Sequence, residues 1–95
     1  MKIKINHQEL EFKFKFKQLK ELCNVTGKEL TELEAITSNL NSIALIASLG
    51  TGKSIEEIET LLDEDGTFDA VQGIVKAFSE EVVQYFSPNS QSQTN

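Results

Sequence analysis

The chain has 95 residues, of which 39% are hydrophobic, and a formal net charge of −6. This length suits one small domain with a single core, and it leaves little room for an elaborate active-site cleft. All nine basic residues are Lys, so the arginines that read guanine and phosphate in specific nucleic-acid complexes are missing, and the acidic balance repels a phosphate backbone. We therefore expect no nucleic-acid partner.

The charge is unevenly distributed along the chain. Residues 1–28 hold seven Lys against three Glu, whereas residues 29–95 hold two Lys against twelve Asp and Glu. Two interpretations of the basic end stay open: a solvated strand face, or a surface complementary to an acidic partner, including a second copy of this chain. A homo-oligomer is accordingly one candidate assembly.

The cysteine count and the apolar runs predict the compartment. Cys23 is the single cysteine, so no internal disulfide can form. The N-terminus alternates apolar and charged residues and has no signal-peptide pattern, and the longest mostly apolar run, Ile43–Leu49, is too short to span a bilayer. We expect a cytoplasmic protein with no membrane partner.

Period-two alternation predicts a β-hairpin at the N-terminus. The first strand covers Lys2–Ile5 and the second covers Glu9–Phe16, with polar turn residues between them. In the second strand we expect four apolar side chains on one face: Leu10, Phe12, Phe14 and Phe16.

Helical spacing and capping signals account for the remaining residues up to 86. They predict, in chain order, a short helix from Phe16 to near Thr26, a turn or helix opened at Thr31–Glu34, a central helix from Ser38 or Asn39 to Leu49, a helix capped by Ser54, and a long final helix with an apolar stripe from Phe68 to Phe86. The predicted fold is α+β: an N-terminal β-hairpin followed by three to five helices packed on one face. Residues 1–86 form one domain, and residues 87–95 form a flexible polar tail.

Two stretches imitate ligand-binding motifs. Ala47–Ser54 fits a relaxed P-loop pattern, but a glycine helix stop followed by a Ser N-cap explains every residue of it. The segment Asp63–Gly66 hints at a calcium loop, yet counting from Gly66 puts Leu61 and Gln72 at two of the main ligand positions. We interpret the first stretch as a helix junction and the second as a capped turn.

The residue types needed for catalysis are not gathered anywhere in the sequence. His7 is the single histidine and lies in the predicted hairpin turn, so no imidazole cluster is available for a metal. Cys23 falls on the apolar face of the first helix, where it is expected to be a small core residue. We expect a protein that is not an enzyme, with no catalytic residues, no metal and no cofactor.

Two features suggest binding of other proteins. The final helix is about 28 Å long at 1.5 Å per residue, roughly twice the length of the others, so its end is expected to overhang the core. Four apolar residues on that end would form a binding patch, Val82, Val83, Tyr85 and Phe86, unless they fold back under the hairpin. The second feature is the hairpin edge, where Lys13 and Lys15 either protect the edge or orient a pairing partner.

Three segments resemble the tail assembly chaperones of long-tailed bacteriophages that infect Gram-positive bacteria. They are the hairpin pattern Lys2–Phe14, the helix start Phe16–Leu22 and the capped helix Ser54–Asp63, followed by a long final helix. The likeness covers most of residues 1–86. The acidic segment Glu29–Glu34 departs from the family pattern.

This resemblance implies a function. Such chaperones bind the long helical tape measure protein, keep it soluble in the host cytoplasm, help recruit tail tube subunits, and are absent from the finished virion. The alternative is a small acidic, self-associating adaptor or regulatory protein without catalytic activity.

Overall fold

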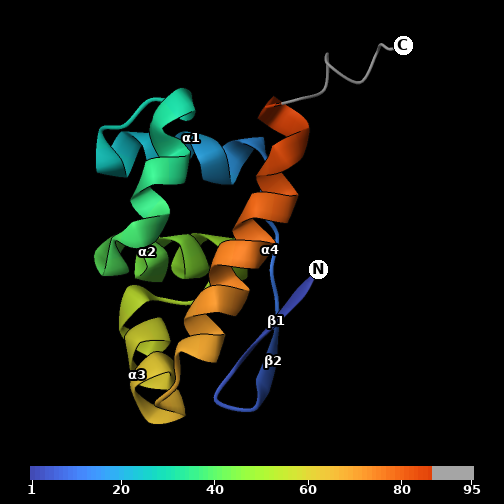
Figure 1. Cartoon of the computed structure of the whole chain (residues 1–95), viewed down its shortest axis with the longest axis vertical. Helices are drawn as coiled ribbons and strands as arrows, with labels where there is room; N and C mark the ends of the chain where they lie inside the picture. The colour runs from blue at the N-terminus through green and yellow to red at the C-terminus, as the bar shows by residue number, and fades with distance from the viewer. Residues whose placement is uncertain (87–95) are drawn as a thin grey trace.

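Strands and helices follow the predicted order in the computed structural model, which describes residues 1–86 except the side chains of Gln84 and Phe86. Within them an antiparallel hairpin precedes five helices (Figure 1): β1 (Lys2–Ile5), β2 (Gln8–Glu11), α1 (Phe16–Thr26), the 3₁₀ helix η1 (Leu30–Ser38), α2 (Leu40–Thr51), α3 (Ile55–Asp65) and α4 (Phe68–Phe86). The predicted α+β fold is confirmed. The predicted tail, residues 87–95, lies outside the described residues.

The hairpin turns through two residues with left-handed backbone. Asn6 and His7 have φ angles of 52° and 67°, the signs that a two-residue type I′ turn requires. Ile3 and Ile5 of β1 are buried while the lysines between them are exposed. The hairpin therefore has one buried face, and the helices pack on it.

The second strand is shorter than predicted. Pairing ends at Glu11, and the next N–H, that of Phe12, donates to the carbonyl of Met1 at 2.7 Å. The chain then leaves the hairpin, because the N–H of Lys13 donates to the carbonyl of Gly50 in α2 at 2.8 Å. The predicted continuation to Phe16 is wrong because β1 offers no further partner.

Side-chain alternation nevertheless continues past the end of β2. Phe12 and Phe14 are fully buried, and their rings stack with centroids 5.8 Å apart. Phe16 does not join them: it is 69% exposed because it already begins α1. The expectation that Phe16 belongs to the buried face is wrong.

Helix α2 is the central helix, as its wide apolar circumference predicts. It packs against α1, η1, α3 and α4. The side-chain oxygen of Asn39 caps its start by accepting from the N–H groups of Asn41 and Ser42 at 2.9 and 3.2 Å. The short helix before it begins earlier than Thr31: its cap is Glu29, whose N–H donates to the side chain of Glu32 at 2.8 Å.

Helix α4 crosses the molecule beside β1 and α2 (Figure 1). Its Phe78 ring meets Phe14 edge-on, with centroids 5.0 Å apart, and its Glu81 carboxylate accepts from the N–H of Phe14 at 3.0 Å. These contacts fix the second half of α4 to the segment that follows β2. No helix within residues 1–86 is long and apolar enough to cross a membrane.

Candidate functional site

The predicted patch at the end of α4 is only partly exposed. Val82 is 4% exposed and belongs to the core, and Tyr85 is half-buried against the core. Val83 is 52% exposed, and the side chain of Phe86 lies outside the described part of the chain. The expectation that Val82 lies on an overhanging surface is wrong, because its side chain is buried. A partner-binding role for the other three residues stays a prediction.

The two lysines assigned to the hairpin edge lie beyond it. Lys13 and Lys15 are both exposed, but they follow β2, which ends at Glu11. The N–H of Lys13 is bonded to α2, and that of Lys15 donates to the side chain of Gln18 at 2.9 Å in the capping box of α1. Their side chains are available to a partner, but their backbone is no sheet edge.

The stretch that imitates a P-loop is a junction between two helices. Ala47–Thr51 lies inside α2, and Gly52 ends that helix in the left-handed conformation with φ 82°. Ser54 then caps α3, its hydroxyl accepting from the N–H of Glu57 at 3.1 Å. The predicted helix stop and N-cap are confirmed.

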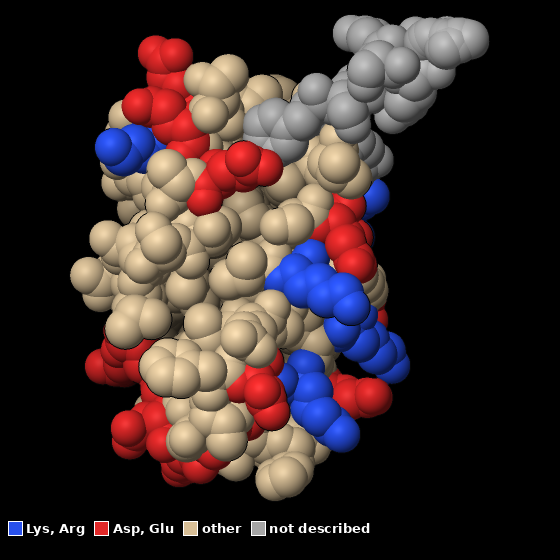
Figure 2. All heavy atoms as spheres, in the orientation of Figure 1, with Lys and Arg blue, Asp and Glu red and all other residues tan. Residues whose placement is uncertain are grey.

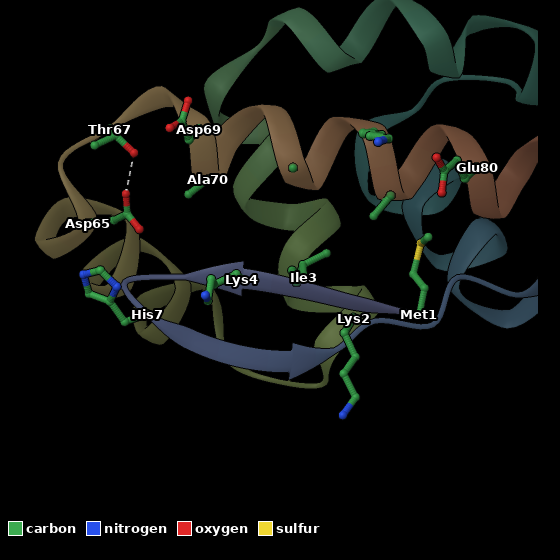
Figure 3. Close-up of a pocket in the computed structure, with 13 residues that line it drawn as sticks. Met1, Lys2, Ile3, Lys4, His7, Asp65, Thr67, Asp69, Ala70 and Glu80 are labelled. Atoms are coloured by element: carbon green, nitrogen blue, oxygen red, sulfur yellow. Dashed lines mark hydrogen bonds between the residues drawn. The ribbon is translucent and has the colours of Figure 1, made fainter.

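A first groove, of about 570 Å³, runs between β1 and α4 (Figure 3). Charged side chains line it along its length, from Lys2 and Glu80 at one end to Asp65 near the hairpin turn. There Asp65 accepts from the backbone N–H of Asn6 and from the hydroxyl of Thr67, the latter at 2.6 Å. The Thr67 hydroxyl, followed by the Asn6 N–H, lowers the pKa of the Asp65 carboxyl below its ordinary value, and the nearby His7 adds a smaller effect in the same direction.

Asp65 therefore works as a structural joint in this groove. Each of its two carboxylate oxygens accepts one of these bonds, which tie the turn between α3 and α4 to the hairpin turn. Across residues 1–86, no three acidic, His or Cys side chains gather closely enough to hold a metal ion.

A second groove, of about 370 Å³, lies between α2, α3 and α4, and we call it the three-helix groove. Its apolar lining includes the buried Ile43 and the half-buried Leu62 and Val71. Leu40 and Phe68 line it while remaining 66% and 72% exposed. An exposed apolar surface of this kind marks a candidate binding site for another protein.

Carboxylates supply the charge of the three-helix groove. Glu59 and Asp63 line it from α3, four residues apart and hence on one helix face. Its lining contains no Lys. Figure 2 shows acidic side chains over α3, and most of the lysines in view lie on the right, near α4 and the hairpin, with further acidic side chains beside them.

Sequence reasoning did not identify this groove. Leu40 and Phe68 both match the apolar pattern of their helices, which predicts burial. Each is the first residue of its helix, however, where neighbouring elements no longer cover the helix. The one feature of the sequence that could have indicated their exposure is their position at the start of a helix. A periodic hydrophobic pattern does not take that position into account.

The chain matches no protein-family model, no curated protein and no solved structure. The likeness to tail assembly chaperones consequently rests on the residue patterns of the hairpin, α1 and α3 and on the long final helix.

Proposed function

We propose that the protein is a tail assembly chaperone of long-tailed bacteriophages, which binds the tape measure protein and helps recruit tail tube subunits in the host cytoplasm before the virion is complete. The observation that carries this proposal is the exposure of Leu40 and Phe68 over an apolar groove in an acidic protein. The residue patterns of the hairpin, α1 and α3 support it.

The physical task fits these properties. A long helical partner that has not yet assembled exposes apolar stripes, and such stripes promote aggregation. A groove with exposed apolar rims can cover part of a stripe, while the net charge of −6 opposes association between complexes. Both properties are needed together, because an apolar groove on a neutral protein would add to the aggregation.

Co-expression tests the proposal directly. The tape measure protein from the same genome is expressed alone, with this chain, and with an unrelated acidic protein of similar size. We expect this chain alone to raise the soluble fraction of the tape measure protein several-fold and to co-purify with it. If the unrelated acidic protein is equally effective, or neither has an effect, the proposal fails.

The charge separation favours a second candidate, the self-associating acidic adaptor. Residues 1–28 hold seven of the nine Lys, residues 29–95 hold twelve of the fifteen acidic residues, and Figure 2 shows lysines near the hairpin and acidic side chains over α3. This uneven distribution lets one copy face another with opposite charges. Sedimentation equilibrium at low and high salt tests this candidate. Oligomers that form at low salt and dissociate into monomers at high salt support the adaptor.

A further inference from the structure

We propose that the three-helix groove binds one amphipathic helix of a partner protein, presenting a large apolar side chain flanked by Lys or Arg. This inference deepens the proposed function and rests on it for the identity of the partner, although the chemistry of the groove stands by itself.

The apolar part of the proposal rests on exposure that folding does not require. Among the side chains that the structure describes, the most exposed large apolar ones are Phe68, Phe16 and Leu40, at 72%, 69% and 66%. Two of these three line the same groove, at the starts of α4 and α2, and the lining between them is mainly apolar. An apolar side chain of a partner would remove both from water at once.

The charge of the groove selects the flanking residues of the partner. Glu59 and Asp63 lie one turn apart on α3 and line the groove, without a basic residue in the lining. Residues 29–95, which contain all three helices of the groove, hold two Lys against twelve acidic residues. Basic flanks are therefore attracted to this surface and acidic flanks are repelled.

The shape of the site favours a helix as the bound element. The groove lies between three helices and is open to solvent. An amphipathic helix presents its apolar side chains in a stripe at three- and four-residue spacing, and such a stripe can lie along a groove of this kind. The groove is lined by the three helices and by the turn residues Gly66 and Thr67, and no strand takes part, so it has no free strand edge with which an extended peptide could pair.

Two designed peptides test the chemistry without the tape measure protein. Each is a helix of about 18 residues, or five turns, with the same leucine stripe; one carries Lys beside the stripe and the other carries Glu. Fluorescence anisotropy measures binding. We expect the Lys peptide to bind at least about tenfold more tightly than the Glu peptide, and the difference to shrink as salt rises from about 0.05 M to about 0.5 M.

Matched variants locate the site. Leu40→Ser with Phe68→Ser should weaken binding of the Lys peptide at least about tenfold. The control is Phe16→Ser with Val25→Ser, which removes two residues 69% and 57% exposed on α1 and should leave binding within about twofold. Thermal melts of the two double variants serve as the check that each remains folded.

Charge reversal separates groove binding from general apolar adhesion. Glu59→Lys with Asp63→Lys should invert the preference, so that the Glu peptide binds more tightly. Equal binding of the two peptides, no binding of either, or equal losses in the groove and control variants would overturn the inference.

The same variants distinguish this inference from the proposed function. If the chain solubilises the tape measure protein equally well with and without Leu40→Ser and Phe68→Ser, the function stands and the groove inference fails. If the Lys peptide binds as expected but the tape measure protein stays insoluble, the groove inference stands and the proposed function fails.

Discussion

A Cβ atom added to Gly50 would lie 2.3 Å from Cε1 of Phe12. Gly50 lies inside α2, and its carbonyl accepts from the N–H of Lys13 at 2.8 Å. The segment after β2 therefore rests directly on the backbone of α2, with the buried Phe12 ring over the glycine. This is a packing requirement, whereas the end of the helix is set by Gly52.

Gly50→Ala should destabilise the protein even though alanine is the better helix former. The helix gains about 1 kcal/mol, but overpacking against a fully buried ring costs about 1 to 3 kcal/mol, and a 2.3 Å approach belongs at the upper end of that range. We expect a net loss of about 1 to 2 kcal/mol, measured by urea denaturation. A smaller ring should relieve the strain, so Gly50→Ala combined with Phe12→Leu should lose less than the sum of the two changes.

Gly73 in α4 provides the matched control. A Cβ atom there meets nothing within 4 Å, and its φ is not positive. Gly73→Ala should therefore stabilise the protein by about 0.5 to 1 kcal/mol. If both substitutions change stability in the same direction, the packing explanation for Gly50 is wrong.

Much of the fold follows from local signals. Short motifs encode the start of α3 at Ser54 and the ends of α1 and α3 at Gly27 and Gly66, and those boundaries match. Helix α2 was expected to end at Leu49, but it continues to Thr51 and is stopped by Gly52. The end of β2 could not be predicted, because alternation reports which side chains are buried rather than which backbone groups pair. Phe12 and Phe14 alternate correctly, yet they pack under α2 and α4 without a strand partner.

The candidate site was harder to predict than the fold. Val82 was expected at the surface from the length of α4, but contacts made by Phe14 and Glu81 bring that end onto the core. Leu40 and Phe68 match the apolar patterns of their helices, which favour burial, but they lie at helix starts and are exposed. Both errors concern tertiary packing at helix ends, which a hydrophobic pattern does not encode.

The Asp65 joint predicts a pH dependence. Hydrogen bonds from Thr67 and Asn6 lower the pKa of this carboxyl in the folded state, so the folded state favours the charged form. The stability that Asp65 contributes is therefore fully present above its unfolded pKa of about 3.9, and it is lost as the pH falls through the lower folded pKa. Asp65→Asn should lower the melting temperature at pH 7, and the difference from the parent should vanish in acid.

Asp63→Asn is the control for that experiment. Asp63 lies on the same helix, is exposed, and takes no part in the joint with Asn6 and Thr67. It should show little change in melting temperature between these conditions. A difference for Asp65→Asn that persists unchanged below the folded pKa would contradict the assigned role.

The protein should be more stable with Gly than with His at position 7 of the hairpin turn. His7 has φ 67°, a left-handed conformation that costs a residue with a side chain about 1 kcal/mol or more. His7→Gly should raise the free energy of unfolding by up to about 1 kcal/mol, part of the gain being offset by greater freedom in the unfolded chain. Gly27→Ala, at φ 73°, should act in the opposite direction in the same denaturation assay.

The end of α4 predicts a contrast between neighbouring valines. Val82 is 4% exposed and Val83 is 52% exposed. Val82→Ala should cost about 2 kcal/mol, because it empties part of the core, whereas Val83→Ala should stay within about 0.5 kcal/mol. Because Val83→Ala is expected to keep the fold stable, it separates an effect on binding from an effect on folding. If this end of α4 contacts the tape measure protein, Val83→Ala should reduce the amount of tape measure protein that co-purifies, with the melting temperature unchanged. Unchanged co-purification would remove Val83 from the predicted binding surface.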